Sequence, residues 1–111
     1  MRRADFRAAY EQGMRRASRH FTAFGRRRGL TGGVRFGITV SRKLGGAVVR
    51  NRIRRRTREL LRQMPESCLG CDVVINPRPA VASAEFLPLG RELGELIRRL
   101  CEALPPLEKA P

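Results

Sequence analysis

A dense run of arginines in the middle of the chain is the first feature that could do chemistry. The stretch GGAVVRNRIRRRTREL, residues 45–60, places six arginines in the nine positions from Arg50 to Arg58. Guanidinium groups are permanently charged and carry a planar fork of donors that fits phosphate oxygens. Four residues apart on a helix they lie about 6 Å apart along its axis, a repeat suited to a phosphate backbone. The run predicts a nucleic-acid contact.

The charge of the whole chain supports this prediction. The 111 residues carry a net charge of +14, and it is regional: residues 1–58 carry +16 and residues 59–111 carry −2. Such a field attracts polyanions, either a nucleic acid or an anionic membrane. No apolar run is long enough to span a bilayer, and MRRADFRAAY lacks the apolar middle of a secretion signal. We therefore expect a soluble cytoplasmic protein with no membrane partner.

Groups able to catalyse a reaction are scarce. His20 is the only histidine, and a nucleophile needs a base beside it. The basic half contains two carboxylates, Asp5 and Glu11, whereas a metal-dependent nuclease needs a cluster of them. The sequence therefore assigns no catalytic residue and no metal ligand to the protein.

Three cysteines, Cys68, Cys71 and Cys101, form an odd set without a secretory context. This predicts reduced thiols in a cytosol-like compartment. Cys68 and Cys71 form a lone C-x-x-C, with no second pair to complete a zinc site. We interpret them as small residues in a turn before a strand.

Aromatic side chains accompany the cations. Phe6 and Tyr10 lie four residues apart in a predicted helix, and Phe24 lies in a predicted strand. Aromatic rings among cations can stack unpaired bases while the cations follow the backbone. Core packing is the alternative for each of them taken singly, and Phe21 and Phe36 are assigned to the core.

The hydrophobic pattern indicates the elements that position these residues. Residues 4–13 read as a short helix, 19–25 as a strand, 25–33 as an exposed loop and 34–41 as a strand with one buried face. After Gly45 and Gly46 the apolar spacing becomes helical and continues to Pro65. A strand over 72–76 and an amphipathic helix over 85–103 follow, with Pro88 in its first turn.

This order predicts one domain over residues 1–104 and a flexible tail over 105–111. A strand, a helix and a second strand in one sheet imply a parallel pair. The expected architecture is an α/β sandwich with helices packed on the sheet.

The stretch SRKLGGAVVRNRIRRRTREL, residues 41–60, resembles the signature of the bacterial ribonuclease P protein component, whose hallmark is Arg50-Asn51-Arg52. The opening DFRAAYEQG, the strand RFGITVSRK and the strand DVVINPRP also resemble that family. The resemblance covers residues 4–101.

The resemblance implies a protein subunit that binds a catalytic RNA and the 5′ leader of precursor tRNA. In that family the RNA, with Mg²⁺, hydrolyses the phosphodiester, so the protein is the accessory subunit of an endoribonuclease. One protein per RNA is expected, with no metal tightly bound to the protein alone. The implied fold is α+β, a two-layer sandwich of order α-β-β-β-α-β-α with a left-handed β-α-β crossover.

The resemblance also implies roles for individual residues. Two sets are expected: RNA-binding residues Lys43, Arg50, Asn51, Arg52, Arg54, Arg55 and Arg58, and a leader-binding cleft of Phe6, Tyr10 and Phe24. Two positions depart from the family pattern. Gly46 stands where asparagine is usual, and Arg56 stands at a usually apolar position, where its stem would cover the core margin and its head would reach solvent.

Other functions fit less well. A ribosomal or general RNA-binding protein fits the charge and the basic helix equally, but the specific motif and the aromatic pair do not favour it. An independent nuclease lacks catalytic groups. A helix-turn-helix DNA binder is disfavoured because the basic helix lies between strands.

Overall fold

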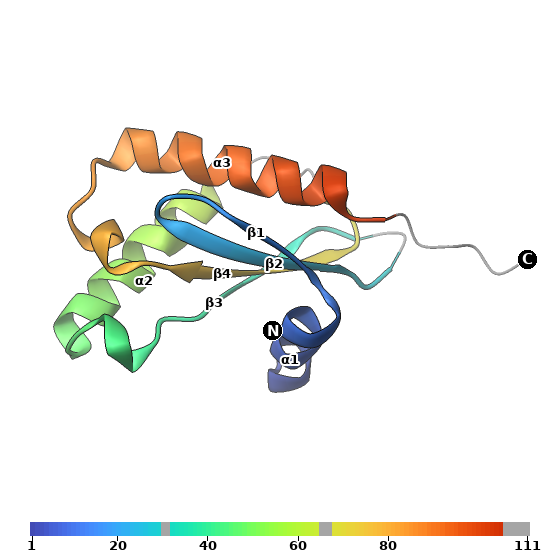
Figure 1. Ribbon diagram of the computed structural model, residues 1–111, viewed down its shortest axis with the longest axis horizontal. Coiled ribbons are helices and arrows are strands. Elements are labelled where there is room, and N and C mark those ends of the chain that lie inside the picture. Colours follow the sequence, from blue (N-terminus) through green and yellow to red (C-terminus); the bar gives the residue numbers. More distant parts are fainter. Residues whose placement is uncertain (30–31, 65–67, 106–111) are drawn as a thin grey trace, which may run out of the picture.

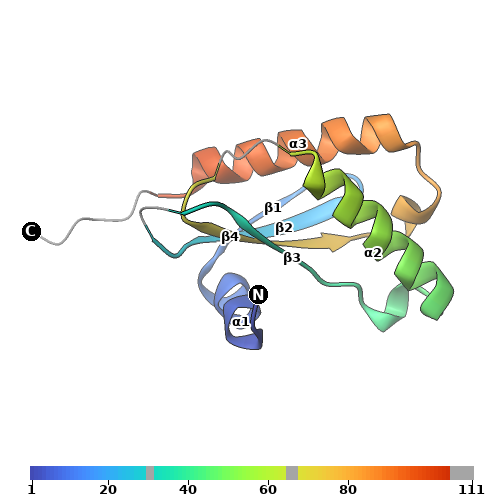
Figure 2. The same cartoon turned by 180° about the vertical axis from the view of Figure 1, so that it is seen from behind.

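A computed structural model describes residues 1–29, 32–64 and 68–105. Its helices pack against a single sheet. Helices α2 and α3 cover one face of the sheet and α1 lies on the other face (Figures 1 and 2). The helices and strands, in chain order, are α1 (Arg3–Gln12), β1 (Met14–Ala17), β2 (Phe21–Arg27), β3 (Arg35–Ile38), the short 3₁₀ helix η1 (Arg42–Leu44), α2 (Ala47–Arg62), β4 (Cys71–Pro77), the 3₁₀ helix η2 (Pro79–Ala82) and α3 (Phe86–Ala103). This is the expected α-β-β-β-α-β-α order.

The four strands lie in the order β1-β2-β4-β3. β2 pairs antiparallel with both β1 and β4, whereas β3 pairs parallel with β4. Parallel strands cannot be joined by a tight turn, so the chain crosses over through α2. The predicted parallel pair with a helical connection is confirmed.

Alternation along the strands separates the two faces of the sheet. In β2, Phe21 and Ala23 are fully buried, whereas Thr22 and Phe24 on the opposite face are only partly buried. The buried face packs against α3, which contributes Leu89, Leu93, Leu96, Ile97 and Leu100 to the core. The prediction that Phe21 belongs to the core is therefore confirmed, and the face carrying Phe24 is left for α1 and for contacts outside the chain.

Element boundaries differ from the sequence prediction at a few points. β2 continues to Arg27, so the expected loop over 25–33 begins later than predicted. Pro88 is the third residue of α3, where its missing N–H costs no helical bond. The expected helix end at Pro65 and the tail residues 106–111 lie outside the described residues. No helix in the described ranges is long and apolar enough to cross a membrane.

The turn before α2 depends on a glycine at one of its two glycine positions. Gly45 has a φ of 139°, a conformation that side chains disfavour. Gly46 is the N-cap of α2 with a φ of −71°, and a Cβ there would meet no atom within 4 Å. The departure at Gly46 therefore causes no strain; it leaves the helix without a side-chain cap.

Candidate RNA interface

Helix α2 separates a packing side from a charged side. Ile53, Thr57, Leu60 and Leu61 are buried against the sheet. Thr57 satisfies its hydroxyl within the helix by donating to the carbonyl oxygen of Ile53 at 2.8 Å. Because these four positions fix how the helix is rotated about its axis, they also decide which arginines face outward.

The exposed side of α2 gathers four of the seven predicted RNA-binding residues. Arg54 Nη1 donates to Asn51 Oδ1 at 3.1 Å. A hollow of about 220 Å³ is lined by this pair together with Arg55 and Arg58. We call Asn51, Arg54, Arg55 and Arg58 the arginine surface. With three guanidinium groups around one hollow and no carboxylate in its lining, it is suited to a phosphate.

The other three predicted RNA-binding residues do not line this hollow. A four-residue step advances about 40° beyond a full turn, so the row from Arg50 to Arg58 winds outward: Arg50 is half-buried and Arg58 is exposed. Arg52 is exposed on the flank of α2 next to Arg55, three positions later, but it does not line the hollow. Lys43 is exposed on η1, before α2 begins.

Arg56 is engaged within the protein. Its guanidinium donates to the carbonyl oxygen of Ala84 and lies 5.6 Å from the centre of the Phe86 ring. The residue is only partly exposed and its Nε is buried, so the head is held against the protein instead of extending freely into solvent. The reason is that the segment between η2 and α3 supplies the acceptor, and Phe86, the first residue of α3, supplies an aromatic face on that side of α2.

The predicted aromatic residues lie along α1 and the sheet face beneath it. The Tyr10 and Phe24 rings meet edge to face with centroids 4.8 Å apart. Tyr10 remains 37% exposed and Phe24 is partly buried. Phe6, one turn earlier, lies over β3: a Cβ at Gly37 would be 2.6 Å from its ring, so a side chain there would displace it.

Phe6 brings the aromatic and basic features together. A hollow of about 500 Å³ has an apolar floor that includes Phe6, Phe36 and Leu61, and three guanidinium groups beside it, those of Arg54, Arg58 and Arg62. We call this hollow the aromatic groove. Arg62 was not among the predicted residues. Its position, four residues after Arg58 on the same outward-winding row, is a signal in the sequence that could have identified it.

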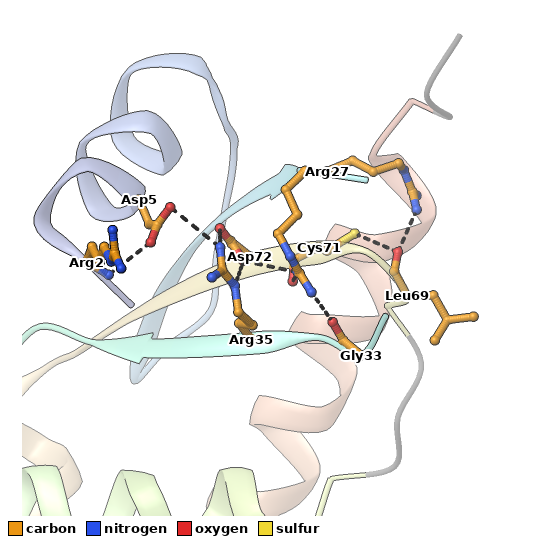
Figure 3. A network of polar contacts seen from close by, with 9 residues as sticks. Arg2, Asp5, Arg27, Gly33, Arg35, Leu69, Cys71 and Asp72 are labelled. Atoms are coloured by element: carbon orange, nitrogen blue, oxygen red, sulfur yellow. Dashed lines mark hydrogen bonds and ion pairs between the residues drawn. The ribbon is translucent and has the colours of Figure 1, made fainter. Parts of the chain in front are cut away.

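Several cations of the basic half serve the fold. Asp72 on β4 is 1% exposed, and Arg35 donates to both of its oxygens at 2.7 Å (Figure 3). Arg28 donates to Asp72 Oδ1 at 3.1 Å and to two backbone carbonyl oxygens. Arg35 Nη2 also lies 3.5 Å from Asp5 Oδ1. Arg28 and Arg35 therefore hold the sheet edge and α1 together.

Asp5 and Asp72, the carboxylates beside the basic residues, already have partners within the protein. The Asp5 carboxylate accepts a hydrogen bond from the backbone N–H of Arg2 and lies near the charge of Arg35. These two partners, in that order, lower the pKa of Asp5. Asp72 is enclosed by arginines. Within the described ranges, no three His, Cys, Asp or Glu residues are grouped as metal ligands would be. These residues do not fit a magnesium site.

His20 has a partner that the sequence did not reveal. Its Nδ1 lies 2.7 Å from Glu92 Oε1, and its backbone N–H donates to Glu92 Oε2 at 2.7 Å. Ser18 Oγ donates to the same oxygen at 2.5 Å. Glu92 thus ties the β1–β2 turn to α3, and the group holds no free nucleophile beside a base.

The cysteine prediction was wrong for two of the three residues. Cys68 and Cys101 form a disulfide across 33 positions, with Cα atoms 5.8 Å apart. Cys71 is a buried free thiol, and burial raises its pKa. The lone C-x-x-C motif therefore does not act as a unit. Spacing along the chain could not reveal that the end of α3 returns to the segment before β4.

Comparison with known proteins shows the family of the chain. The family model for ribonuclease P matches residues 1–101. The ribonuclease P protein component of Desulfovibrio desulfuricans is 38% identical over 108 residues, covering 94% of this chain and 83% of the relative.

Solved structures of the same kind superpose on the fold. The ribonuclease P protein of Thermotoga maritima aligns with a TM-score of 0.77 at 30% identity, covering 89% of this chain and 94% of that one. That of Staphylococcus aureus aligns with a TM-score of 0.72 at 28% identity, covering 91% and 86%. The chain therefore belongs to the ribonuclease P protein family, the protein subunit of the endoribonuclease that processes the 5′ end of tRNA.

Proposed function

We propose that this protein binds ribonuclease P RNA through the arginine surface and holds the 5′ leader of precursor tRNA along the aromatic groove and the Tyr10–Phe24 pair. Lys43, Arg50 and Arg52 would add contacts to RNA before α2 and along its N-terminal half. One protein would bind one RNA, in the cytoplasm of the bacterial cell. Removal of the leader would be carried out by the complex.

One observation carries this proposal: the hollow that Phe6 enters from α1 is also lined by Arg54 and Arg58 from α2. An unpaired nucleotide presents a flat apolar base and an anionic phosphate, which are the two surfaces that the aromatic groove offers. A helix that contacts only a folded RNA would need the arginines, but it would not need the adjoining aromatic floor.

The protein supplies binding in this proposal, and the RNA with its Mg²⁺ supplies the hydrolysis. The metal would lower the pKa of an attacking water and stabilise the charge that develops on the phosphate. The protein's contribution is to position the leader and to offset repulsion between two polyanions. We therefore expect the protein alone to leave precursor tRNA uncut, and the complex to cleave it at a lower Mg²⁺ concentration than the RNA alone.

The test uses the complex of this protein with the ribonuclease P RNA of the same organism. Binding of precursor tRNA is measured with a full leader and with no leader. The wild-type protein should bind the leader-bearing tRNA more tightly, and Phe6→Leu, which keeps apolar volume but removes the aromatic face, should reduce that difference.

Phe86→Leu is the matched control, because Phe86 contacts Arg56 on the side of α2 away from the groove. It should retain the wild-type preference for the leader. Equal affinity of the wild-type complex for tRNA with and without a leader would refute the leader-binding role.

A further inference from the structure

A small polar cluster lies beside the predicted stacking rings, where Tyr10 of α1 meets the sheet. The Tyr10 hydroxyl lies 2.9 Å from Thr39 Oγ1 and 3.0 Å from Asn76 Oδ1. These three residues come from α1, the chain after β3, and β4. A single hydroxyl donates one hydrogen bond, so Tyr10 can donate to Asn76 while Thr39 donates to Tyr10.

Asn76 is the position of β4 that breaks the burial pattern. Every other residue from Cys71 to Pro77 is buried, whereas Asn76 is partly exposed. Its Oδ1 is held by Tyr10, and its Nδ2 donates no hydrogen bond to any of the described residues. A strand interior favours β-branched or aromatic residues over asparagine. The amide is therefore anchored at one end and offers two N–H donors at the other.

The neighbours of Asn76 on the sheet include a ring and a cation. Thr22 is its partner across the β2–β4 pair, and Phe24, two residues along β2, lies on the same face. Arg15 is the partner of Phe24 on β1 and is exposed. The amide on β4, the ring on β2 and the cation on β1 thus lie on three neighbouring strands, with the ring in the middle.

We propose that Asn76 makes leader binding selective for sequence, by hydrogen bonding to the edge of the unpaired base that stacks beside Tyr10 and Phe24. This inference rests on the proposed leader-binding function. Stacking by itself tolerates every base, whereas an amide held in one orientation offers a fixed order of acceptor and donor. Arg15 takes the neighbouring phosphate.

The experiment measures the affinity of the complex with its RNA for precursor tRNAs in which each leader position in turn carries all four bases. At one position, wild-type affinities should differ by about 5- to 10-fold, the low end for one amide–base contact because the site is open to water. Asn76→Leu removes both the acceptor and the donors, and the four affinities should fall within about twofold of one another.

Asn76→Asp separates base contact from positioning of Tyr10. The carboxylate still accepts from the Tyr10 hydroxyl but has no N–H to donate, so the order of preference among the four bases should change. Both variants should retain the melting temperature and the wild-type affinity for leaderless tRNA.

Three results would overturn the inference: no base preference at any leader position in the wild type, a preference unchanged in Asn76→Leu, or a preference lost in Asn76→Leu but kept in Asn76→Asp. The last would mean that Asn76 only positions Tyr10. Failure of the proposed function itself looks different, because wild-type affinity would then be indifferent to the presence of a leader.

Discussion

The arginine surface makes a quantitative prediction about salt. Replacing Arg54, Arg55 and Arg58 together by glutamine removes three guanidinium groups that line one hollow. Each phosphate contact contributes about 0.9 to the slope of log affinity against log salt for a duplex and about 0.7 for a single strand. Loss of three contacts should therefore flatten the slope by about 2 to 3.

The same arithmetic gives the change in affinity. Between 50 and 200 mM salt, one contact contributes a factor of about 2.6 to 3.5, and three contribute about 20 to 40. The advantage of the wild type over the triple variant should shrink by that factor across this range. The assay is the binding of ribonuclease P RNA at several salt concentrations, followed by filter retention or fluorescence anisotropy.

A charge-matched control lies on α3, which packs on the face of the sheet opposite α1 and carries the exposed Arg91, Arg98 and Arg99 (Figure 1). Arg98 is held by Glu95 and Glu102 on its own helix. Replacing these three by glutamine removes the same net charge. If this variant flattened the slope as much as the α2 variant, the general field of the protein would explain binding, and contact through α2 would be refuted.

Three further predictions concern stability. Asp72→Asn should lower the free energy of unfolding, measured with urea, by about 2 to 3 kcal/mol. This is less than for a fully buried pair because Arg28 and Arg35 are partly exposed. An unchanged urea midpoint would contradict the role of the network. Cys101→Ser should cost about 3 to 4 kcal/mol, from the loop that the disulfide closes, and equal stability of the wild type with and without reductant would argue against that bond. Burial works to raise the pKa of Glu92, but hydrogen bonds from Ser18 and His20 outweigh it and lower that pKa below its ordinary 4.5. The stabilisation is therefore present above pH 4.5 and is lost as pH falls through the lowered pKa, so the stability gap between wild type and Glu92→Gln should close in acid; a gap independent of pH would contradict this.

The sequence alone determined the features that depend on local periodicity. Alternation in β2 placed Phe21 inside and Phe24 on the other face, and helical spacing separated Ile53 and Leu60 from the arginines of α2. These patterns are set by the two-residue and 3.6-residue repeats of the backbone, which need no knowledge of distant segments. The arginine motif and the net charge likewise indicated an RNA partner before any fold was known.

Only the tertiary structure decided which of these residues meet. The rotation of α2 on the sheet half-buries Arg50, leaves Arg52 outside the hollow of the arginine surface and adds Arg62 to the groove of Phe6. Asn76 meets Tyr10 across 66 positions, and Cys68 meets Cys101 across 33. Such pairings follow from strand order and helix docking, which sum many weak contacts over the whole chain, so no local pattern of residues contains them.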